Sequence, residues 1–212
     1  MVAEYVSDAV IRRLPGYYRY LQELEDMGEK QISSKELGKR MGLTASQIRQ
    51  DINCFGGFGR QGYGYEVSVL KHHIGDILGL YQEYKMIVIG AGNIGHAVAN
   101  YANFQSEGFE VIGIFDSDKE KEGQVINGMV VQSNEEIKNV LDKEKVDIGV
   151  IAVPAKEAQS LADFLVEKGV KGIWNFAPKD IKVPEEVSVV NVHLSDSLQV
   201  LSFKMTHEKQ RS

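Results

Sequence analysis

A short apolar run followed by spaced glycines restricts the fold more than any other feature of this chain. Met86 to Ile89 is typical of a buried strand, and Gly90, Gly92 and Gly95 follow it directly. Glycines in this spacing serve a tight turn, a close approach of the backbone to a pyrophosphate, and close packing of a helix on a strand. The pattern therefore predicts a nucleotide-binding loop that opens a helix from about Ile94 to Asn103.

A carboxylate downstream narrows the choice of nucleotide. A second strand, Glu110 to Phe115, ends at Asp116, which lies 21 residues past Gly95. A carboxylate at this point accepts hydrogen bonds from the adenine-side ribose and repels a 2′-phosphate, so the sequence favours NAD and NADH over their phosphorylated forms. Asp118 is an alternative for the ribose, although its place beyond the strand is more typical of a solvated loop. A Rossmann-like fold with an empty loop stays open as the other interpretation.

Strands and helices go on alternating after this point, which predicts an α/β fold with a doubly wound parallel sheet. The predicted elements are strand Val125–Val131, helix Asn134–Lys143, strand Asp147–Val153, helix Ala155–Lys168, and strands Gly172–Phe176 and Val187–Val192. Ligands of such sheets lie at the carboxyl ends of the strands. Two proline-containing segments fall at such ends, either as turns that stop a strand or, as we expect here, as walls of the coenzyme site. The predicted coenzyme residues are Gly90, Ala91, Gly92, Asn93, Ile94, Gly95, Asp116, Ser117, Val153, Pro154, Asn175, Phe176, Ala177 and Pro178.

The first part of the chain has clear helix boundaries. After two helices separated near Pro15, Ser33 to Glu36 forms a capping box that opens a short helix, which Gly42 ends. Thr44 to Gln47 is a second capping box, and the helix that follows has an apolar stripe at Ile48, Ile52 and Phe55. Two helices joined by a glycine turn predict a helix-turn-helix.

The second of these helices has the side chains needed to contact DNA. Arginine pairs with guanine, and glutamine or asparagine with adenine, in the major groove. Gly56 to Tyr65, rich in glycine and aromatic residues, predicts a β-hairpin wing with Arg60 at its tip, although a plain glycine loop is the alternative. The predicted DNA-contacting residues on the helix are Ser46, Gln47, Arg49, Gln50 and Asn53.

Charge and composition agree with this interpretation. The chain has a net charge of −6, but residues 30–60 contain six basic residues against two acidic ones, so a local positive surface can meet phosphates. The longest apolar run is too short for a membrane span and the first residues are not signal-like, so we expect a cytoplasmic protein. Cys54 is the only cysteine, which excludes a cysteine-rich metal site, and we expect no metal. Cys54 is either a buried, inert thiol or a redox-active one.

The remaining segments complete the predicted organisation. Helical spacing from Val67 to about Tyr84 indicates a connector, and Leu194, Leu198, Leu201 and Met205 form an apolar stripe in a C-terminal helix. We predict a DNA-binding domain over 1–84, a Rossmann domain over 85–192, and a dimerisation helix over 193–212. A chain with a coenzyme loop and no catalytic domain is expected to be a sensor. The alternatives are a small dehydrogenase, and a CoA-binding or scaffold module, which Asp116 disfavours.

Several motifs together resemble the Rex family of redox-sensing transcriptional repressors. They are Arg13-Leu14-Pro15 with Tyr17 and Arg19, Ser46 to Asp51, Phe55 to Tyr65, Gly90 to Gly95, Asp116, Val153-Pro154 and Asn175 to Pro178. The resemblance implies a homodimer that represses genes of fermentative metabolism by binding double-stranded palindromic operator DNA. It also implies that NADH releases the DNA, that NAD⁺ permits binding, and that the C-terminal helix is exchanged between subunits.

The resemblance also implies roles for single residues. By position, Tyr101 corresponds to a tyrosine near the nicotinamide, and Arg19 to an arginine that pairs with an acidic residue on the exchanged helix. In this chain His193 stands at the acidic position, with Asp196 nearby. Gln50 and Gln61 stand where many members of the family have lysine or arginine. The residues expected to face DNA on this basis are Arg13, Ser46, Gln47, Arg49, Gln50, Arg60 and Gln61.

Overall fold

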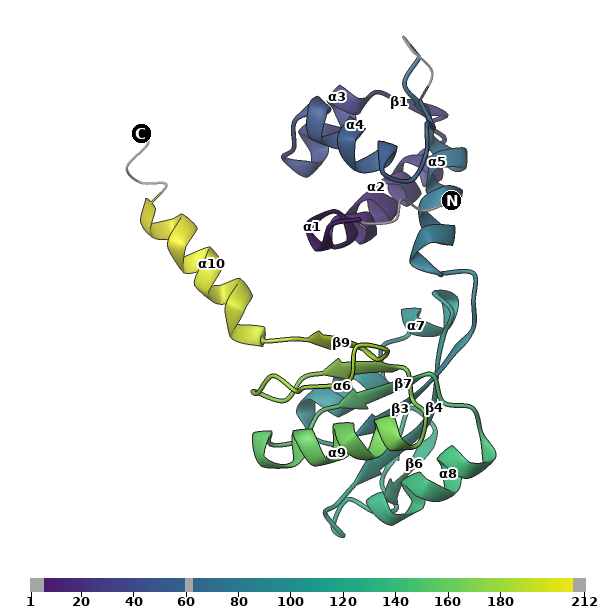
Figure 1. Cartoon of the computed structure of the whole chain (residues 1–212), viewed down its shortest axis with the longest axis vertical. Helices are drawn as coiled ribbons and strands as arrows, with labels where there is room; N and C mark the ends of the chain where they lie inside the picture. Colours follow the sequence, from purple (N-terminus) through teal and green to yellow (C-terminus); the bar gives the residue numbers. More distant parts are fainter. Residues whose placement is uncertain (1–5, 60–62, 208–212) are drawn as a thin grey trace. The chain divides into compact units, whose positions relative to one another are not determined.

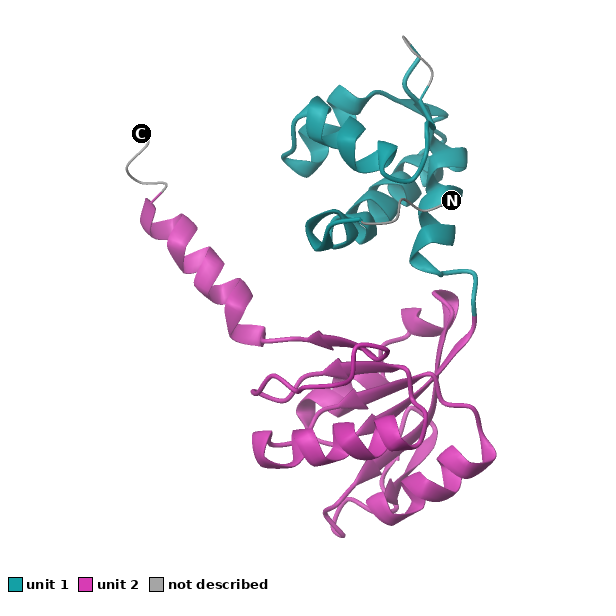
Figure 2. Ribbon diagram, viewed as in Figure 1, with its two compact units in different colours: residues 1–82 teal, residues 83–212 magenta. Residues whose placement is uncertain are grey.

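The computed structural model describes residues 6–59 and 63–207, and the chain divides into two compact units, Met1–Gln82 and Glu83–Ser212 (Figures 1 and 2). Each unit has its own hydrophobic core. Within the described ranges, no helix has the length and apolar character needed to cross a membrane.

Unit 1 is a small helical domain with a two-stranded sheet. Its elements are α1 (Asp8–Ile11), α2 (Leu14–Asp26), β1 (Gln31–Ile32), α3 (Ser34–Met41), α4 (Ala45–Asn53), β2 (Tyr65–Glu66) and α5 (Val67–Leu78). Pro15 lies in the first turn of α2, where its missing N–H costs no hydrogen bond. Gly79 ends α5 in the left-handed conformation, with φ of 72°, so the connector helix stops before the predicted Tyr84.

The helix-turn-helix has the predicted form, with one tight contact that the sequence pattern did not reveal. Gly42 adopts φ of 68° after α3, and Thr44 then caps α4. A Cβ added at Gly38 would lie 2.5 Å from the carbonyl oxygen of Leu43, so only glycine lets the turn pass this close to α3. Ile48 and Ile52 of α4 are buried in the core of the unit, as the apolar stripe predicts.

The tip of the predicted wing hairpin, residues 60–62, lies outside the described residues, so the hairpin stays a prediction. The described strand β2 runs antiparallel to β1, with Ile32 opposite Tyr65, a pairing that the sequence pattern did not predict. Among the described residues, Gly56 to Gly59 have no strand conformation. The partner strand comes from before α3 because Gly64, with φ of 79°, lets the chain approach the backbone of Ile32 closely. Such a long-range pairing leaves no local pattern in the sequence.

Unit 2 is a doubly wound sheet, which confirms the predicted fold class. Its strands are β3 (Tyr84–Ile89), β4 (Phe109–Asp116), β5 (Val125–Ile126), β6 (Met129–Ser133), β7 (Ile148–Ile151), β8 (Gly172–Asn175) and β9 (Ser188–Asn191). They lie in the order β5-β6-β4-β3-β7-β8-β9, and all neighbours except β5 and β6 are parallel. The helical segments are α6 (Asn93–Ala99), α7 (Asn103–Ser106), η1 (Asn134–Glu136), α8 (Ile137–Lys143), α9 (Ala155–Glu167) and α10 (Leu194–His207).

Two predicted elements of this unit are shorter in the structure than in the prediction. The single strand Val125–Val131 is a hairpin, because Asn127 and Gly128 take positive φ angles of 49° and 77° and form a two-residue turn. The helix predicted from Ile94 to Asn103 ends at Ala99. There the side chain of Asn100 donates a hydrogen bond of 2.8 Å to the carbonyl oxygen of His96, which competes with a further helical turn.

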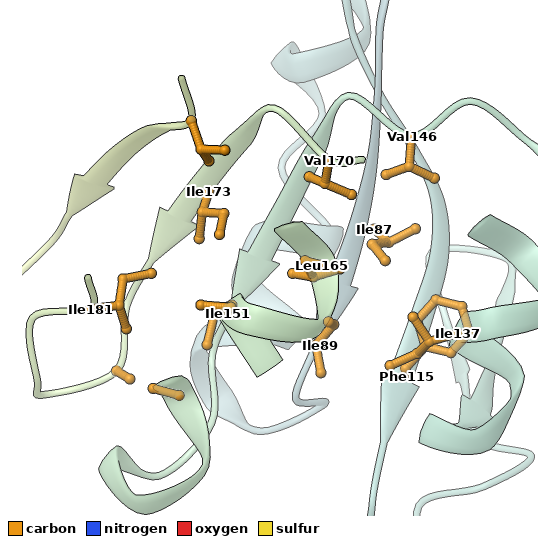
Figure 3. Close-up of a cluster of buried hydrophobic side chains, with 14 residues drawn as sticks. Ile87, Ile89, Phe115, Ile137, Val146, Ile151, Leu165, Val170, Ile173 and Ile181 are labelled. Atoms are coloured by element: carbon orange, nitrogen blue, oxygen red, sulfur yellow. The ribbon is translucent and has the colours of Figure 1, made fainter. Parts of the chain in front are cut away.

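Both faces of the sheet are packed. On one face Ile87, Ile89 and Phe115 pack against Ala158 and Leu165 of α9 (Figure 3). On the other face the intervening residues of β3, Met86 and Val88, pack against Val98 of α6. This alternation follows the two-residue repeat of strands, in which successive side chains point to opposite faces of the sheet.

α10 is the exception to this packing. Every described residue of the helix is exposed, including Leu194, Leu198, Leu201 and Met205, at 50% to 66%. An apolar helix that covers nothing in its own unit leaves a large hydrophobic surface in water, which is uncommon for a monomer.

Candidate functional site

The predicted coenzyme loops meet at one edge of the sheet. The register places Ile89 beside Phe115 and Ile151, and Ile151 beside Asn175, so four parallel strands end at the same level. The loops that follow these residues therefore lie next to one another. They contain Gly90–Gly95, Asp116–Ser117, Val153–Pro154 and Asn175–Pro178.

Glycine stands at the three positions of the first loop for different reasons. Gly90 has φ of 102°, and a Cβ there would lie 2.3 Å from the carbonyl oxygen of Ala152. A Cβ at Gly95 would lie 1.8 Å from the carbonyl oxygen of Gly90, so only glycine lets the first turn of α6 pack this close to the end of β3. Gly92, in contrast, has open space around its missing side chain. Its backbone is thus accessible to a ligand, as the pyrophosphate-binding role requires.

Asp116 closes this loop with its side chain. It is only 6% exposed, and its Oδ2 accepts a hydrogen bond of 2.7 Å from the backbone N–H of Ala91. Oδ2 also accepts from the ammonium of Lys121 at 2.9 Å, and Oδ1 accepts from the N–H of Asp118 at 2.8 Å. Burial raises the pKa of Asp116, but these donors outweigh it and hold the pKa below its usual value. The carboxylate is therefore ionised at neutral pH, as a ribose acceptor must be.

Asn175 is buried, and its side chain forms hydrogen bonds with the backbone of the loop that follows it. Its amide nitrogen donates to the carbonyl oxygen of Lys179 and to Oδ1 of Asn191, both at 2.8 Å. Its oxygen accepts from the N–H of Ala177 at 3.1 Å. All polar atoms of the side chain are in use, so Asn175 shapes the turn after β8, and the coenzyme would meet the turn that it holds.

Tyr101 lies apart from these loops. It follows the C-terminal end of α6, whereas Gly92 is the N-cap of the same helix, so the seven residues of α6 separate the two by about 10 Å. Its ring is 51% exposed and packs against Phe104, with ring centroids 4.6 Å apart. Within one chain, Tyr101 is therefore not brought together with the other predicted coenzyme residues.

The residues at this edge fit a dinucleotide. The accessible backbone at Gly92 suits a pyrophosphate, and the buried carboxylate of Asp116 suits a ribose. No group of three potential metal-ligating side chains is present in the described part of the chain. His96 is exposed and contacts Asn100 through its ring nitrogen, so it has no catalytic partner among the described residues.

The second candidate surface is the exposed face of α4 in unit 1. Ser46, Arg49, Gln50 and Asn53 are all exposed and recur at helical spacing, so they share one side of the helix. Arg49 also donates a hydrogen bond of 3.1 Å to the hydroxyl of Ser34, at the start of α3. These side chains form a polar, hydrogen-bonding surface of the kind that enters a major groove.

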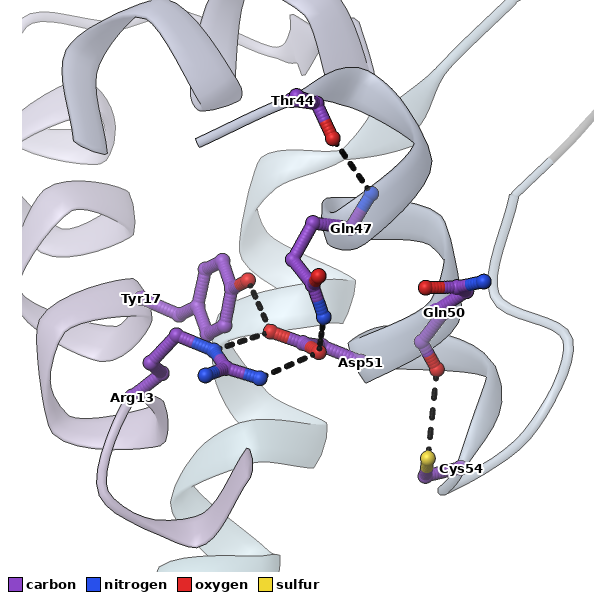
Figure 4. Close-up of polar contacts among 7 residues, drawn as sticks. All are labelled: Arg13, Tyr17, Thr44, Gln47, Gln50, Asp51 and Cys54. Carbon is purple, nitrogen blue, oxygen red and sulfur yellow. Dashed lines mark hydrogen bonds and ion pairs between the residues drawn. The ribbon is translucent and has the colours of Figure 1, made fainter. Parts of the chain in front are cut away.

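Gln47 and Arg13 have contacts within the unit. The N–H of Gln47 donates to Thr44 Oγ1, but its side chain does not reach back to Thr44, so the predicted second capping box is only half formed. Instead Gln47 Nε2 donates to Asp51 Oδ1 at 2.8 Å (Figure 4). Arg13 binds the same carboxylate with two nitrogens, and the hydroxyl of Tyr17 donates to it at 2.7 Å.

Asp51 is the residue that sequence reasoning missed in this unit. It is 1% exposed, although acidic residues are almost never buried unless they are paired. Burial raises its pKa, but the donors from Arg13, Gln47 and Tyr17 outweigh this effect and lower the pKa below its usual value. The sequence does contain a signal, because Asp51 is the one acidic residue of α4. Its partner Arg13 lies 38 residues away, so spacing along the chain cannot identify the pair.

The other predicted residues have these positions. Arg60 and Gln61 lie outside the described residues. Arg19 is exposed and lies over the ring of Tyr20, 5.8 Å from its centroid. His193 Nε2 is 2.8 Å from Asp180 Oδ1, so this histidine has an acidic neighbour within its own unit. Cys54 is partly exposed, and its thiol donates to the carbonyl oxygen of Gln50 at 3.3 Å.

Comparison with known proteins gives two family models that match this chain. One is described as "CoA binding domain" and matches residues 81–179, and the other, "Putative DNA-binding protein N-terminus", matches residues 5–53. The first match lies on unit 2 except for residues 81 and 82, and the second lies on unit 1. They agree with the fold of each unit.

Full-length relatives are more specific. A redox-sensing transcriptional repressor Rex from Caldicellulosiruptor saccharolyticus is 52% identical over 210 residues, covering 98% of this chain and 96% of that protein. The Rex protein of Clostridium acetobutylicum is 54% identical over 197 residues, covering 93% and 92%. Both are repressors, which agrees with the prediction of a sensor in place of an enzyme.

Solved structures give the same result. RSP, a Rex-family repressor, has been solved in complex with beta-NAD⁺ and operator DNA, and that structure matches with a TM-score of 0.90 and 50% identity, covering 97% of this chain and 95% of that one. A second RSP structure, in complex with beta-NADH, matches with a TM-score of 0.89 and 48% identity, covering 97% and 96%. The chain therefore belongs to the Rex family of redox-sensing transcriptional repressors.

Proposed function

We propose that this chain acts as a homodimer that binds palindromic operator DNA through unit 1 and releases it when NADH binds to unit 2. The observation that carries the proposal is the buried carboxylate of Asp116, which ends β4 and binds the glycine loop through the N–H of Ala91. This is the place from which a Rossmann domain holds the adenine ribose. The RSP complexes with NAD⁺, NADH and operator DNA, proteins about half identical to this chain, support it.

The coenzyme would lie along the edge of the sheet. The backbone of Gly90 to Gly95, including Ala91, Asn93 and Ile94, would hold the pyrophosphate, with Asp116 and Ser117 at the ribose. The loops after β7 and β8 would form the wall toward the nicotinamide, through Val153, Pro154, Phe176, Ala177 and Pro178. Asn175 would keep the second of these loops in place.

The surface of α4 would read the operator. Arg49 is suited to guanine, and Gln50 or Asn53 to adenine, while Ser46 lies at the start of the helix where phosphates bind. Gln47 uses one amide N–H for Asp51, so it would offer DNA its oxygen and the other N–H. Arg13 would contribute by positioning α4 through the carboxylate of Asp51. Arg60 and Gln61 would contact the phosphate backbone of the DNA from the predicted wing.

A second copy of the chain is the expected partner of α10. The helix exposes four aligned apolar side chains that nothing in its own unit covers. Residues 193–212 would thus act as the dimerisation element beside a DNA-binding domain over 1–84 and a Rossmann domain over 85–192. Because Tyr101 lies at the far end of α6 from its own glycine loop, we expect it to reach a nicotinamide only in the site of the second copy.

The coupling follows from the difference between the two oxidation states. When bound, the nicotinamide ring carries a positive charge as NAD⁺ and none as NADH, so the protein can favour a different arrangement with each. Linkage then requires that DNA weakens NADH binding by the factor by which NADH weakens DNA binding. A shift from 1:99 to 99:1 needs about 5.5 kcal/mol, which two sites in a dimer would share.

Two other functions make different predictions. A small dehydrogenase would need an acid or base placed at the nicotinamide, and the residues that we assign to the nicotinamide wall, Val153, Pro154 and Phe176 to Pro178, include no such group. A CoA-binding module is suggested by the description of one matching family model. The buried carboxylate at the end of β4 favours a ribose diol over CoA, which carries a 3′-phosphate on its ribose. We expect the protein to act in the cytoplasm, where the pools of NADH and of DNA meet.

The test is a DNA-binding titration of the full chain. A fluorescent palindromic operator, selected from a randomised pool, is titrated at several NADH to NAD⁺ ratios and at two salt concentrations. We expect affinity to fall as the share of NADH rises, whereas added CoA has no effect. Unchanged affinity across the ratios would leave a plain transcription factor, and steady oxidation of NADH with added oxo-acids would indicate an enzyme.

A further inference from the structure

We propose that Lys121 is a second specificity-determining residue at the ribose edge, and that it reduces the discrimination of Asp116 against a 2′-phosphate. The inference rests on the proposed coenzyme site and deepens it. Lys121 lies five residues beyond Asp116, on the loop that follows β4. Its ammonium is 2.9 Å from Asp116 Oδ2, and its side chain is 32% exposed, so it faces both the carboxylate and the solvent.

Counting hydrogen bonds shows how little of the carboxylate is free. An ionised carboxylate has about four acceptor positions, two on each oxygen. Oδ2 uses both, for the N–H of Ala91 and the ammonium of Lys121, and Oδ1 uses one, for the N–H of Asp118. One position on Oδ1 remains. Asp116 can therefore accept from only one ribose hydroxyl while Lys121 stays in place.

The second hydroxyl of the ribose then has a donor beside it. An ammonium has three N–H groups, and the contact with Asp116 uses one of them. Lys121 can donate another to a ribose oxygen next to the one that Asp116 binds. A carboxylate and an ammonium at this distance present a nearly neutral pair to the ribose, where Asp116 alone would present a full negative charge.

The pair changes the response to a 2′-phosphate. A phosphate near an unpaired buried carboxylate is repelled strongly, because little water lies between them to screen the charges. Lys121 offsets this repulsion and can donate directly to phosphate oxygens. The site should thus prefer NADH to NADPH by a smaller factor than an aspartate without a cationic neighbour would give.

The test removes the ammonium of Lys121 and keeps a long, unbranched side chain. Lys121→Met removes the charge, Lys121→Arg keeps it, and Lys119→Met is the matched control, because Lys119 is an exposed lysine of the same loop without a resolved partner in the described structure. Binding of NADH and NADPH to each full-length variant is measured by coenzyme fluorescence. AMP and adenosine 2′,5′-bisphosphate are added as competitors at millimolar concentration, so that weak binding still registers.

We expect Lys121→Met to lower the affinity for NADPH and for adenosine 2′,5′-bisphosphate at least tenfold, and the affinities for NADH and AMP by threefold at most. Lys121→Arg should keep most of the affinity for the two ligands with a 2′-phosphate. Lys119→Met should change the affinity for each of the four ligands by less than twofold. An equal loss for phosphorylated and unphosphorylated ligands in Lys121→Met, or the same selective loss in Lys119→Met, would overturn the inference. Failure of the wild-type chain to bind NADH would instead overturn the proposed function.

Discussion

Asp51 of α4 is held by Arg13 through two hydrogen bonds, 2.6 Å from Nε to Oδ2 and 2.8 Å from Nη2 to Oδ1. Arg13 directly precedes α2, so the pair joins the helix that would read DNA to the helix at the centre of the core of unit 1 (Figure 4). Tyr17, fully buried on α2, adds a third donor to the same carboxylate. A buried charge with its partners in place fixes one orientation of α4, and without them it is costly.

Arg13→Ala is therefore expected to destabilise unit 1 strongly. It leaves the Asp51 carboxylate buried without its cation, a change that typically costs about 3–5 kcal/mol. The free energy of unfolding, measured by denaturant titration followed through circular dichroism, checks this. The neighbouring Arg12→Ala is the control, because Arg12 pairs with Asp8 on the surface, where both side chains are at least 77% exposed, and it should have little effect. Equal effects of the two substitutions would contradict a structural role for the Asp51 network.

Acid should weaken the same network. The pKa of Asp51 is lower in the folded chain than in the unfolded one, so the unfolded state binds more protons between the two values. The stabilisation is complete above the unfolded value of about 4 and is lost as the pH falls through the folded value. Unfolding measured at several pH values should show this loss in the wild-type chain. Asp51→Asn should flatten the slope in that range, and an unchanged slope in the variant would assign the acid sensitivity to other carboxylates.

The sequence predicted most of what local patterns control. The capping box at Ser33, the glycine turn at Gly42 and the apolar stripe at Ile48 and Ile52 are all present, because each depends on residues within one or two turns. The alternation of strands and helices predicted the parallel sheet for the same reason. The Asn127-Gly128 turn is also a local signal, but the apolar residues on both sides of it predict one continuous strand.

Long-range pairings could not be predicted in the same way. The β1 partner of β2 and the Arg13 partner of Asp51 come from more than 30 residues away, and nothing in their neighbourhoods marks them. The coenzyme edge was easier, because a parallel sheet brings the ends of its strands together whatever their separation in sequence. Even there, the contact of Lys121 with Asp116 depends on the path of a loop, which no periodicity describes.

Charges placed on the apolar stripe of α10 are expected to prevent dimerisation. Leu198→Asp with Leu201→Asp puts two carboxylates on the surface that we assign to the second copy, where burying them would be costly. Light scattering after size-exclusion chromatography should give the mass of one chain for this variant and of two for the wild type. Gln199→Asp with Thr206→Asp adds the same charge on another side of the helix and should leave the dimer intact. A wild-type monomer, or a dimer that survives the leucine substitutions, would show that α10 is not the dimer element.

Removal of Arg49 should weaken operator binding without unfolding unit 1. Arg49 is exposed on α4, and its one side-chain hydrogen bond in the described structure, with Ser34, lies on the surface. A side chain paired with guanine contributes about 1–3 kcal/mol, or roughly a 5- to 150-fold change in affinity. Fluorescence anisotropy with the selected operator and with scrambled DNA measures the effect for Arg49→Ala, with Arg12→Ala as the control. A loss of equal size on both DNAs would indicate a phosphate contact, and no loss would remove Arg49 from the interface.

Two glycines of the coenzyme loop should respond differently to the same substitution. An added methyl group at Gly95 would overlap the carbonyl oxygen of Gly90, so Gly95→Ala should lower both the melting temperature and the affinity for NADH. Gly92 has open space and φ of −81°, an angle that alanine adopts without strain, so Gly92→Ala should keep the melting temperature of the wild type. If the pyrophosphate approaches the backbone at this point, the methyl group should nevertheless lower the affinity for NADH about tenfold or more, since it occupies the space that the ligand needs. Thermal unfolding and coenzyme fluorescence on the same samples separate the two effects. Full NADH affinity in Gly92→Ala would mean that the coenzyme does not lie against this loop, because the open space at Gly92 is the feature of the fold that admits it.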